Sequence, residues 1–305
     1  MNKHILTDRI IQLLASLFIG KNRFFANSIE SPAIKDILNR VKLEKTPIEA
    51  GRHEVQASTP QGFIDPAYYV FQMKGKNFPT IIYHHGNNER PFDFGKFSKN
   101  SFKDIFYKKA NELNANIIIV RAPFHNSTLK EYQAKISRMA NFTAMLATSV
   151  VLIESLIHQL ETDGFSEPVA VSGISLGGWA TNLHRAYYNT AGIYIPMLAG
   201  AALGDLFLTS TYRKMAAKIT HENPSKIRSI LNFEDDFDKA KGKNVFPLLG
   251  KYDQYIQYDV QKGCYGNSNR INVLERGHVT SLTDSSKLLE HILNTMNLSQ
   301  NNYEF

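Results

Sequence analysis

PVAVSGISLGGW, residues 168–179, predicts a buried strand that turns sharply into a helix. The short apolar run with β-branched residues is typical of a strand covered on both faces, and residues 179–186 have a helix-forming composition. Ser175 has a glycine two residues to either side, Gly173 and Gly177. A Cβ at either glycine would collide across such a turn. The turn therefore predicts an exposed Ser175 hydroxyl, with the next backbone N–H groups aimed at the same space.

Strand and helix patterns alternate from about residue 80, around this central stretch. An alternation of this kind favours a mostly parallel sheet with helices on both faces, the α/β class. An antiparallel pair of strands, 54–58 and 67–73, is expected at one edge. The further strands predicted are 80–84, 115–120, 191–200, 244–250 and 270–274, and the helices are 33–41, 97–113, a long helical region ending near 162, and 281–296.

One domain accounts for most of the chain. Residues 1–50 read as an N-terminal helical segment, and residues 51–305 as the α/β domain. Residues 201–243 carry several short helical patterns and little strand signal, which predicts a helical cap inserted into that domain.

Bulk composition is that of an ordinary soluble globular protein, with 43% hydrophobic and 21% charged residues. The single cysteine, Cys264, excludes an intrachain disulfide and a cysteine-based zinc site, and it fits a cytoplasmic location. The formal net charge is +7, and the densest basic cluster lies between Lys96 and Lys109. Acidic and aromatic residues interrupt that cluster and no nucleic-acid motif accompanies it, so we expect a solvated helix face and no nucleic-acid partner.

The N-terminus contains an apolar run, residues 10–19, that is too short for a membrane-spanning helix. Its apolar residues fall on one helical stripe, which predicts an amphipathic helix that packs on the domain or serves oligomerisation. Membrane contact through residues 1–25 and a signal peptide are the alternatives, although Asp8 is unusual in a signal peptide. The stripe consists of Leu6, Ile10, Leu13, Leu14, Leu17 and Phe18.

Ser175 needs a base to remove its proton and an acid to orient that base, if its hydroxyl is to act as a nucleophile. Such partners belong at the carboxyl ends of later strands, where sites in open α/β sheets form. Asp253 follows the strand 244–250, and His278 follows the strand 270–274. The backbone N–H of Leu176, directly after the serine, is an expected donor to an oxyanion.

Four motifs in this order resemble the α/β-hydrolase superfamily over about residues 50–300. They are His85-Gly86, the Gly-x-Ser-x-Gly motif of 173–177, Gly250-Lys251-Tyr252-Asp253, and Gly277-His278. The resemblance implies an α/β-hydrolase fold, a catalytic triad of Ser175, His278 and Asp253, an oxyanion hole from the amides of Leu176 and Asn87, and a cap over the site.

Two departures from the family pattern leave alternatives open. Residues 84–88 lack a glycine that often follows in the family's oxyanion loop, so Asn88 is the alternative to Asn87. Asp205 stands where some members carry their acid, and it is the alternative to Asp253.

A serine hydrolase acting on a small-molecule carboxylic ester or related acyl bond is therefore the predicted function. A peptidase or thioesterase of the same fold shares the machinery, and a non-catalytic binding protein of this fold is the alternative outside enzymes. A membrane-associated lipase is a further hypothesis, which rests on the N-terminal stripe and the basic charge. We expect no cofactor, and no metal at His84, His85 and His125, because no carboxylate spacing accompanies these histidines. Oligomeric state and acyl-chain length stay undetermined by sequence.

Overall fold

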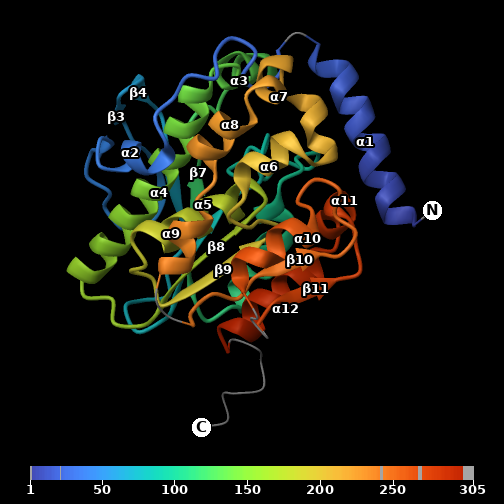
Figure 1. The fold of residues 1–305 in the computed structure, drawn as a ribbon. Coiled ribbons are helices and arrows are strands. Elements are labelled where there is room, and N and C mark those ends of the chain that lie inside the picture. Colours follow the sequence, from blue (N-terminus) through green and yellow to red (C-terminus); the bar gives the residue numbers. More distant parts are fainter. Residues whose placement is uncertain (1, 21, 241–242, 267–269, 298–305) are drawn as a thin grey trace.

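An eight-stranded sheet forms the centre of the computed structural model, which describes residues 2–20, 22–240, 243–266 and 270–297 (Figure 1). The strand order is β11-β10-β9-β8-β6-β7-β5-β2. The strands are β2 (Gly51–Glu54), β5 (Ala67–Gln72), β6 (Thr80–His84), β7 (Asn116–Arg121), β8 (Val169–Ile174), β9 (Ile193–Met197), β10 (Leu248–Gly250) and β11 (Asn272–Leu274).

Strands β6 to β11 run parallel, whereas β5 pairs antiparallel with β7, and β2 pairs antiparallel with β5 at the edge. The predicted mostly parallel sheet with an antiparallel pair at one edge is thus confirmed. One predicted strand was wrong: residues 54–58 divide between two sheets. After Glu54 the chain leaves β2, and β3 (Ala57–Thr59) joins a separate three-stranded sheet with β1 (Lys42–Leu43) and β4 (Gly62–Ile64).

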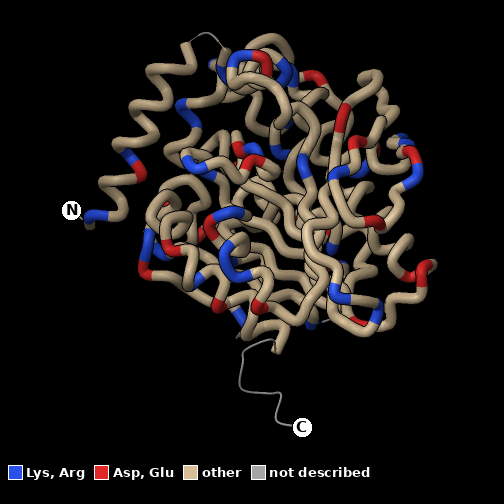
Figure 2. The backbone as a smooth tube through the Cα atoms, turned by 180° about the vertical axis from the view of Figure 1, so that it is seen from behind, with Lys and Arg blue, Asp and Glu red and all other residues tan. Residues whose placement is uncertain are grey.

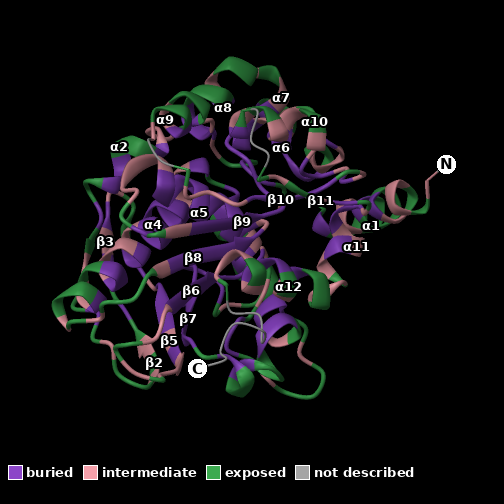
Figure 3. Cartoon of the chain, turned by 90° about the horizontal axis from the view of Figure 1, so that it is seen from below, coloured by how far each residue is buried: buried purple, intermediate pink, exposed green. Residues whose placement is uncertain are grey.

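Alternate residues of the central strands supply two different cores, which explains why these strands are apolar throughout. Ile82 and Ile118 lie in a buried cluster with residues of α4 (Met139–Thr162). Ile81 and Ile117 lie in a second cluster with residues of α12 (Ser285–Thr295). Both faces of the sheet are therefore buried (Figure 3).

Helix α4 is long and apolar enough to cross a membrane by length and composition, and 72% of the relevant window is buried inside the molecule. It is the one such helix in the described part of the chain. Burial of α4 against the sheet explains its apolar composition, because a helix that is hydrophobic on all sides is typical of a protein core.

Three predicted helices differ from the structure. The long region before 162 is two helices, α3 (Leu129–Ile136) and α4. The segment 97–113 forms only a π-helical turn, η1 (Lys103–Tyr107), and a 3₁₀ turn, η2 (Ala110–Glu112). The side chains of Glu89 and Asn100 accept the N–H groups of Ser101 and Lys103, which fixes where the helical segment begins. The closing helix is α11 (His278–Leu282) followed by α12.

The basic residues of 96–109 do not stand out as a uniform patch. Figure 2 shows Lys and Arg interspersed with Asp and Glu over the face that it presents. Lys109 pairs with Glu112 at 3.1 Å, and Lys103 donates to the carbonyls of Gly95 and Ser98. These local partners are those of an ordinary solvated surface.

Short helices fill the predicted cap segment, of which residues 241–242 lie outside the described residues. Figure 3 shows them on one side of the sheet together with α2 (Ile34–Leu38), and α5 (Leu176–Tyr187) packs against β8, β9 and α9. The elements are α6 (Leu203–Leu208), η3 (Thr211–Met215), α7 (Lys218–Glu222), α8 (Pro224–Leu231) and α9 (Glu234–Lys239), and α10 (Tyr258–Gln261) and η4 (Lys262–Tyr265) follow β10.

The N-terminal helix α1 (Lys3–Ile19) packs on the domain, but with the face opposite to the predicted one. It lies beside α11 and η3, and its buried residues are Asp8, Gln12 and Ile19 (Figures 1 and 3). The predicted apolar stripe is exposed instead, with Phe18 at 87%. The prediction was wrong about the face because Asp8 and Gln12, together with Ile19, are buried in place of the apolar stripe.

Candidate active site

Ser175 stands on the predicted sharp turn between β8 and α5. Its backbone has φ 53° and ψ −111°, which is a strained conformation for a residue with a side chain. A Cβ on Gly173 would lie 2.4 Å from the backbone of Gly177, and a Cβ on Gly177 would lie 2.1 Å from the carbonyl oxygen of His84. Both glycines are therefore required for the close approach of the turn to the sheet.

His278 and Asp253 form a buried hydrogen-bonded pair. The Nδ1 atom of His278 donates to Oδ2 of Asp253 at 2.7 Å. The other carboxylate oxygen accepts the backbone N–H groups of Tyr255 and Ile256, each at 2.8 Å. Asp253 is thus fixed by its own loop, and it leaves the Nε2 atom of His278 as the nitrogen able to act as a base.

The pKa of His278 lies above its usual value of 6.5. Burial alone lowers this pKa, but the charge and hydrogen bond of Asp253, together with the charge of Asp8, outweigh burial. The pair therefore favours the protonated imidazole that a general base becomes during the reaction.

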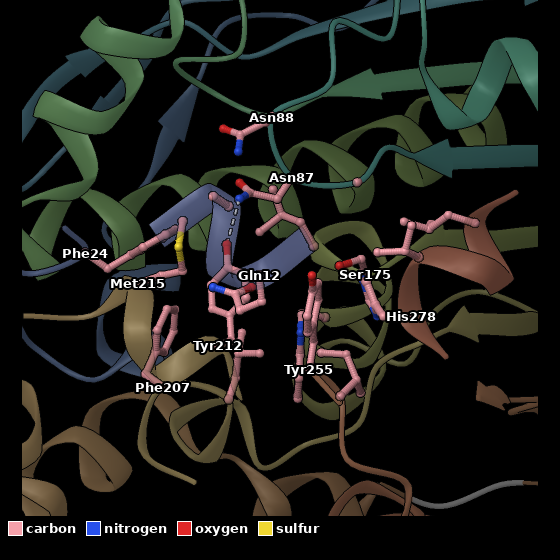
Figure 4. A pocket seen from close by; sticks show the side chains of 18 of the residues that line it. Gln12, Phe24, Asn87, Asn88, Ser175, Phe207, Tyr212, Met215, Tyr255 and His278 are labelled. Atoms are coloured by element: carbon pink, nitrogen blue, oxygen red, sulfur yellow. Dashed lines mark hydrogen bonds between the residues drawn. The ribbon is translucent and has the colours of Figure 1, made fainter. Parts of the chain in front are cut away.

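A cavity of about 240 Å³ contains both Ser175 and His278 among its lining residues. Figure 4 shows these two side chains on the same wall, with Tyr255 beside them. Most of the remaining lining is apolar and comes from α1 and the segment after it, from the cap segment and from α4. These residues include Ile11, Ala15, Phe24, Phe142, Leu203, Leu206, Phe207 and Met215.

The predicted oxyanion donors border the same cavity. Leu176 opens helix α5, where a backbone N–H has no acceptor within the helix. Asn87 and Asn88 both line the cavity, and Asn88 has a positive φ of 62°. The side chain of Asn87 accepts the Tyr132 hydroxyl and donates to the Tyr212 hydroxyl at 3.3 Å, so this loop is held in place. The choice between Asn87 and Asn88 stays open.

Asp205, the alternative acid, is not the hydrogen-bond partner of His278 and lies in the cap segment. Its carboxylate pairs with the Arg228 guanidinium at 2.7 Å and accepts the Asn232 amide at 3.1 Å, on helices of the cap segment. The structure brings Asp253, and not Asp205, to His278.

The three neighbouring histidines, His84, His85 and His125, have structural partners. His84, His85 and His125 are buried against one another, and each Nδ1 donates to a backbone carbonyl. Burial lowers the pKa of His84 to about 4 and that of His125 to about 3, so both rings are neutral near pH 7. Among the described residues, no group of three His, Cys, Asp or Glu side chains is placed to hold a metal ion.

Comparisons with known proteins agree with this architecture. Residues 105–223, less than half of the chain, match the family model "Alpha/beta hydrolase domain containing 18". A Pyrococcus horikoshii acylaminoacyl peptidase superimposes with a TM-score of 0.57 and 14% identity, over 86% of this chain and 44% of the peptidase. Est1E from Butyrivibrio proteoclasticus superimposes with a TM-score of 0.54 and 14% identity, over 81% of this chain and all of Est1E (100%).

The chain has the α/β-hydrolase fold. Acetyl xylan esterase 1 from Thermoanaerobacterium sp. JW/SL YS485 matches over 96% of this chain and 94% of its own, with a TM-score of 0.53 and 13% identity. Identities this low establish the fold alone, and the chain spans less than half the length of the peptidase. A search of curated proteins gives no match.

Sequence reasoning missed the part of this α/β-hydrolase fold that α1 contributes to the site. Asp8 and Gln12 are buried, and the Asp8 carboxylate contacts the loops that carry both His278 and Asp253. A signal was present: Asp8 is a carboxylate at the start of an otherwise apolar helical run. A buried carboxylate requires hydrogen-bond partners, so Asp8 in this position indicates a specific contact between the N-terminal helix and the domain.

Proposed function

We propose that this protein is a serine hydrolase that cleaves a carboxylic ester or related acyl bond. The observation that carries the proposal is the buried Asp253–His278 pair, whose histidine shares one cavity with a strained, glycine-flanked Ser175. A structural turn serine has no physical need for an imidazole paired with a carboxylate in the same cavity, whereas a nucleophile does.

The proposed reaction runs in two halves. Nε2 of His278 takes the Ser175 proton as Oγ attacks the carbonyl carbon, and the resulting imidazolium is stabilised by Asp253. The imidazolium then protonates the leaving alcohol, which departs and leaves an acyl group on Ser175. Water, deprotonated by His278, attacks this acyl-enzyme; the bond between the acyl carbon and Ser175 Oγ then breaks, the imidazolium returns the proton to Oγ, and the acid is released. Backbone amides of Leu176 and of Asn87 or Asn88 hold the oxyanion in both halves.

The shape and chemistry of the cavity support an acyl chain as the group bound. Its lining is mainly aromatic and aliphatic, and its volume of about 240 Å³ lies just below the range of roughly 300–1,000 Å³ that is usual for small-molecule sites. A short or medium acyl chain fits these two properties better than a long one.

A panel of 4-nitrophenyl esters of increasing acyl length, from acetate to dodecanoate, tests the proposal. We expect the highest kcat/KM in the short to medium range, and loss of hydrolysis in Ser175→Ala. A matching thioester and a peptide anilide in the same panel separate esterase from thioesterase and peptidase activity. Equal hydrolysis by the wild type and Ser175→Ala would exclude the proposed nucleophile.

Membrane contact through residues 1–25 is a second proposal, favoured by the exposed stripe of α1. Lys3, Asp8 and Arg9 are the charged residues of this helix, and its last ten residues, 10–19, are uncharged. Figure 2 shows this half of α1 without Lys, Arg, Asp or Glu. Because Ile11 and Ala15 of the same helix line the cavity, a membrane-bound α1 would place the pocket next to the lipid.

A further inference from the structure

Asp8 joins three backbone amides that belong to the two loops carrying His278 and Asp253. Its Oδ2 atom accepts the N–H of His278 at 2.7 Å and the N–H of Gln254 at 3.1 Å. Its Oδ1 atom accepts the N–H of Val279 at 3.0 Å. The carboxylate is fully buried, so these bonds are not exchanged with bulk water.

The Asp8 carboxylate caps the N-terminus of α11, a role that a side chain at the start of the helix usually has. His278 and Val279 are the first two residues of that helix, and their N–H groups have no acceptor within it. The residue before them is Gly277, which has no side chain to cap them. A carboxylate from a segment about 270 residues away in the chain supplies the missing acceptor.

Gly277 leaves space for the Asp8 carboxylate because it has no Cβ. Its backbone, with φ −85° and ψ −176°, is one that any residue adopts, so the glycine is not needed for conformational freedom. A Cβ at this position would lie 2.7 Å from Oδ2 of Asp8, and the three nearest atoms would all belong to Asp8. The glycine is therefore required by the approach of Asp8.

We propose that Asp8 is a positioning residue for the catalytic pair: through its three amide bonds, helix α1 holds the His278 and Asp253 loops at the spacing that general-base catalysis requires. This inference rests on the proposed function. Asp8 touches no reacting atom, and it acts on the geometry and charge around His278. The titratable groups near the His278 ring are Asp253, Asp8 and Tyr255, and His4 bonds to Thr280 one turn away.

Asp8→Asn tests the proposal, because it keeps the shape and replaces one acceptor oxygen by a donor that opposes the amides. We expect kcat to fall roughly 10- to 100-fold with KM almost unchanged, because alignment is lost while the cavity remains. The pKa governing the acid side of kcat/KM should also fall, since the Asp8 charge raises the pKa of His278. Arg9→Gln, on the same helix and bonded to the Gln254 side chain, is the matched control and should keep wild-type kcat.

Gly277→Ala extends the test to a double-mutant cycle. On the wild-type background the added methyl group displaces the Asp8 carboxylate, and kcat should fall about as far as in Asp8→Asn. On the Asp8→Ala background the methyl group meets no carboxylate, so Gly277→Ala should cost nothing further. Additive losses would overturn the proposal, as would unchanged kcat in Asp8→Asn.

Amide hydrogen exchange keeps this inference separate from the proposed function. The measurement needs no catalytic activity, so it can be made in the Ser175→Ala background. There, Asp8→Asn should speed amide hydrogen exchange in the segments around residues 254 and 278–279. If Asp8→Asn speeds exchange but the wild-type protein hydrolyses no ester, the proposed function is contradicted and the structural role of Asp8 is supported. An active enzyme in which Asp8→Asn changes neither exchange nor kcat would sink the inference alone.

Gln12 supports a second inference from a different observation. Its side chain is 2% exposed and lines the cavity, and its amide nitrogen has no hydrogen-bond partner among the described residues (Figure 4). A buried N–H donor without a partner lowers the stability of the fold. An oxygen atom of a bound ligand would supply the missing acceptor. We infer that Gln12 selects substrates with a carbonyl or hydroxyl oxygen on the chain away from the scissile bond.

Matched 4-nitrophenyl esters test this selection: a plain hexanoate and hexanoates with a ketone at successive positions along the chain. We expect one ketone position to be preferred by the wild type, and Gln12→Leu to lower the ratio of kcat/KM for that ester to kcat/KM for the plain ester roughly 10- to 100-fold. Equal effects on all esters would overturn the inference. Failure of the wild type to hydrolyse any ester would instead count against the proposed function.

Discussion

At the scale of single residues, the proposed function makes His278 the group whose protonation sets the pH dependence of activity. A general base must be neutral to accept the serine proton, so activity should rise as pH increases through the pKa of His278. Because this pKa is raised, the midpoint of the acid limb of kcat/KM should lie above 6.5. The measurement is kcat/KM from about pH 5 to about pH 9. A midpoint near 4 would point instead to a residue such as His84.

Asp253 can be tested against the rejected acid, Asp205. Asp253→Asn should lower kcat by roughly 10³- to 10⁴-fold, because the amide cannot stabilise the imidazolium and favours the wrong tautomer of His278. Asp205→Asn removes an ion pair with Arg228 in the cap segment and should leave kcat near the wild-type value. Steady-state kinetics of both variants measure the contrast. The reverse order of effects would reinstate Asp205.

Much of the site was predictable from sequence because the chemistry requires particular residue types at strand ends. Ser175 and His278 line one cavity, and Asp253 bonds to His278. The catalytic roles that the motif order predicts for these three residues stay predictions. Asp8 was not predictable in this role. Its partners are backbone amides, which leave no mark in the sequence, and only Gly277 gives an indirect trace of the contact.

At the scale of elements, the junction of β8 and α5 is the least tolerant part of the fold. Gly177→Ala would place a Cβ 2.1 Å from a backbone oxygen that cannot rotate away. We expect a loss of about 3 kcal/mol or more in the free energy of unfolding, and a Tm lowered by several degrees. Gly263→Ala is the matched control, because nothing lies within 4 Å of its added Cβ. Thermal unfolding of both variants gives the comparison, and equal Tm values would contradict the packing argument.

Element boundaries were less predictable than element types, for reasons that lie outside each element. The break between α3 and α4 occurs at Arg138, whose backbone is extended and bridges to Ser28. The N–H of Met139, the first residue of α4, donates to the Ser28 carbonyl at 2.9 Å. A contact between segments more than a hundred residues apart thus ends one helix and starts the next, and local periodicity does not record it.

At the scale of the whole molecule, α1 combines a polar buried face with an apolar exposed one. Packing on the domain was correctly predicted, but the face was not, because amphipathic patterns assume that the apolar side is the buried one. The inversion makes sense if α1 has two partners, the catalytic loops on one side and a lipid surface on the other.

Vesicle flotation tests the second partner. Phe18 and Leu17 are 87% and 70% exposed, and replacing both by serine should weaken vesicle binding by at least about 100-fold, given roughly 1.5–3 kcal/mol for each large apolar side chain. Phe97→Ser is the matched control, since Phe97 is 90% exposed on another part of the surface. Flotation that Leu17→Ser/Phe18→Ser leaves unchanged would remove the membrane proposal without affecting the hydrolase proposal.

The central claim is that Ser175 is an activated nucleophile, and intact-protein mass spectrometry after treatment with a fluorophosphonate tests it most directly. A fluorophosphonate forms a stable bond only with a serine whose proton is taken up by a neighbouring base. We expect a single adduct on the wild type, mapped to Ser175, and none on Ser175→Ala or His278→Ala. A wild type that stays unlabelled, or an adduct that persists in Ser175→Ala, would contradict the account.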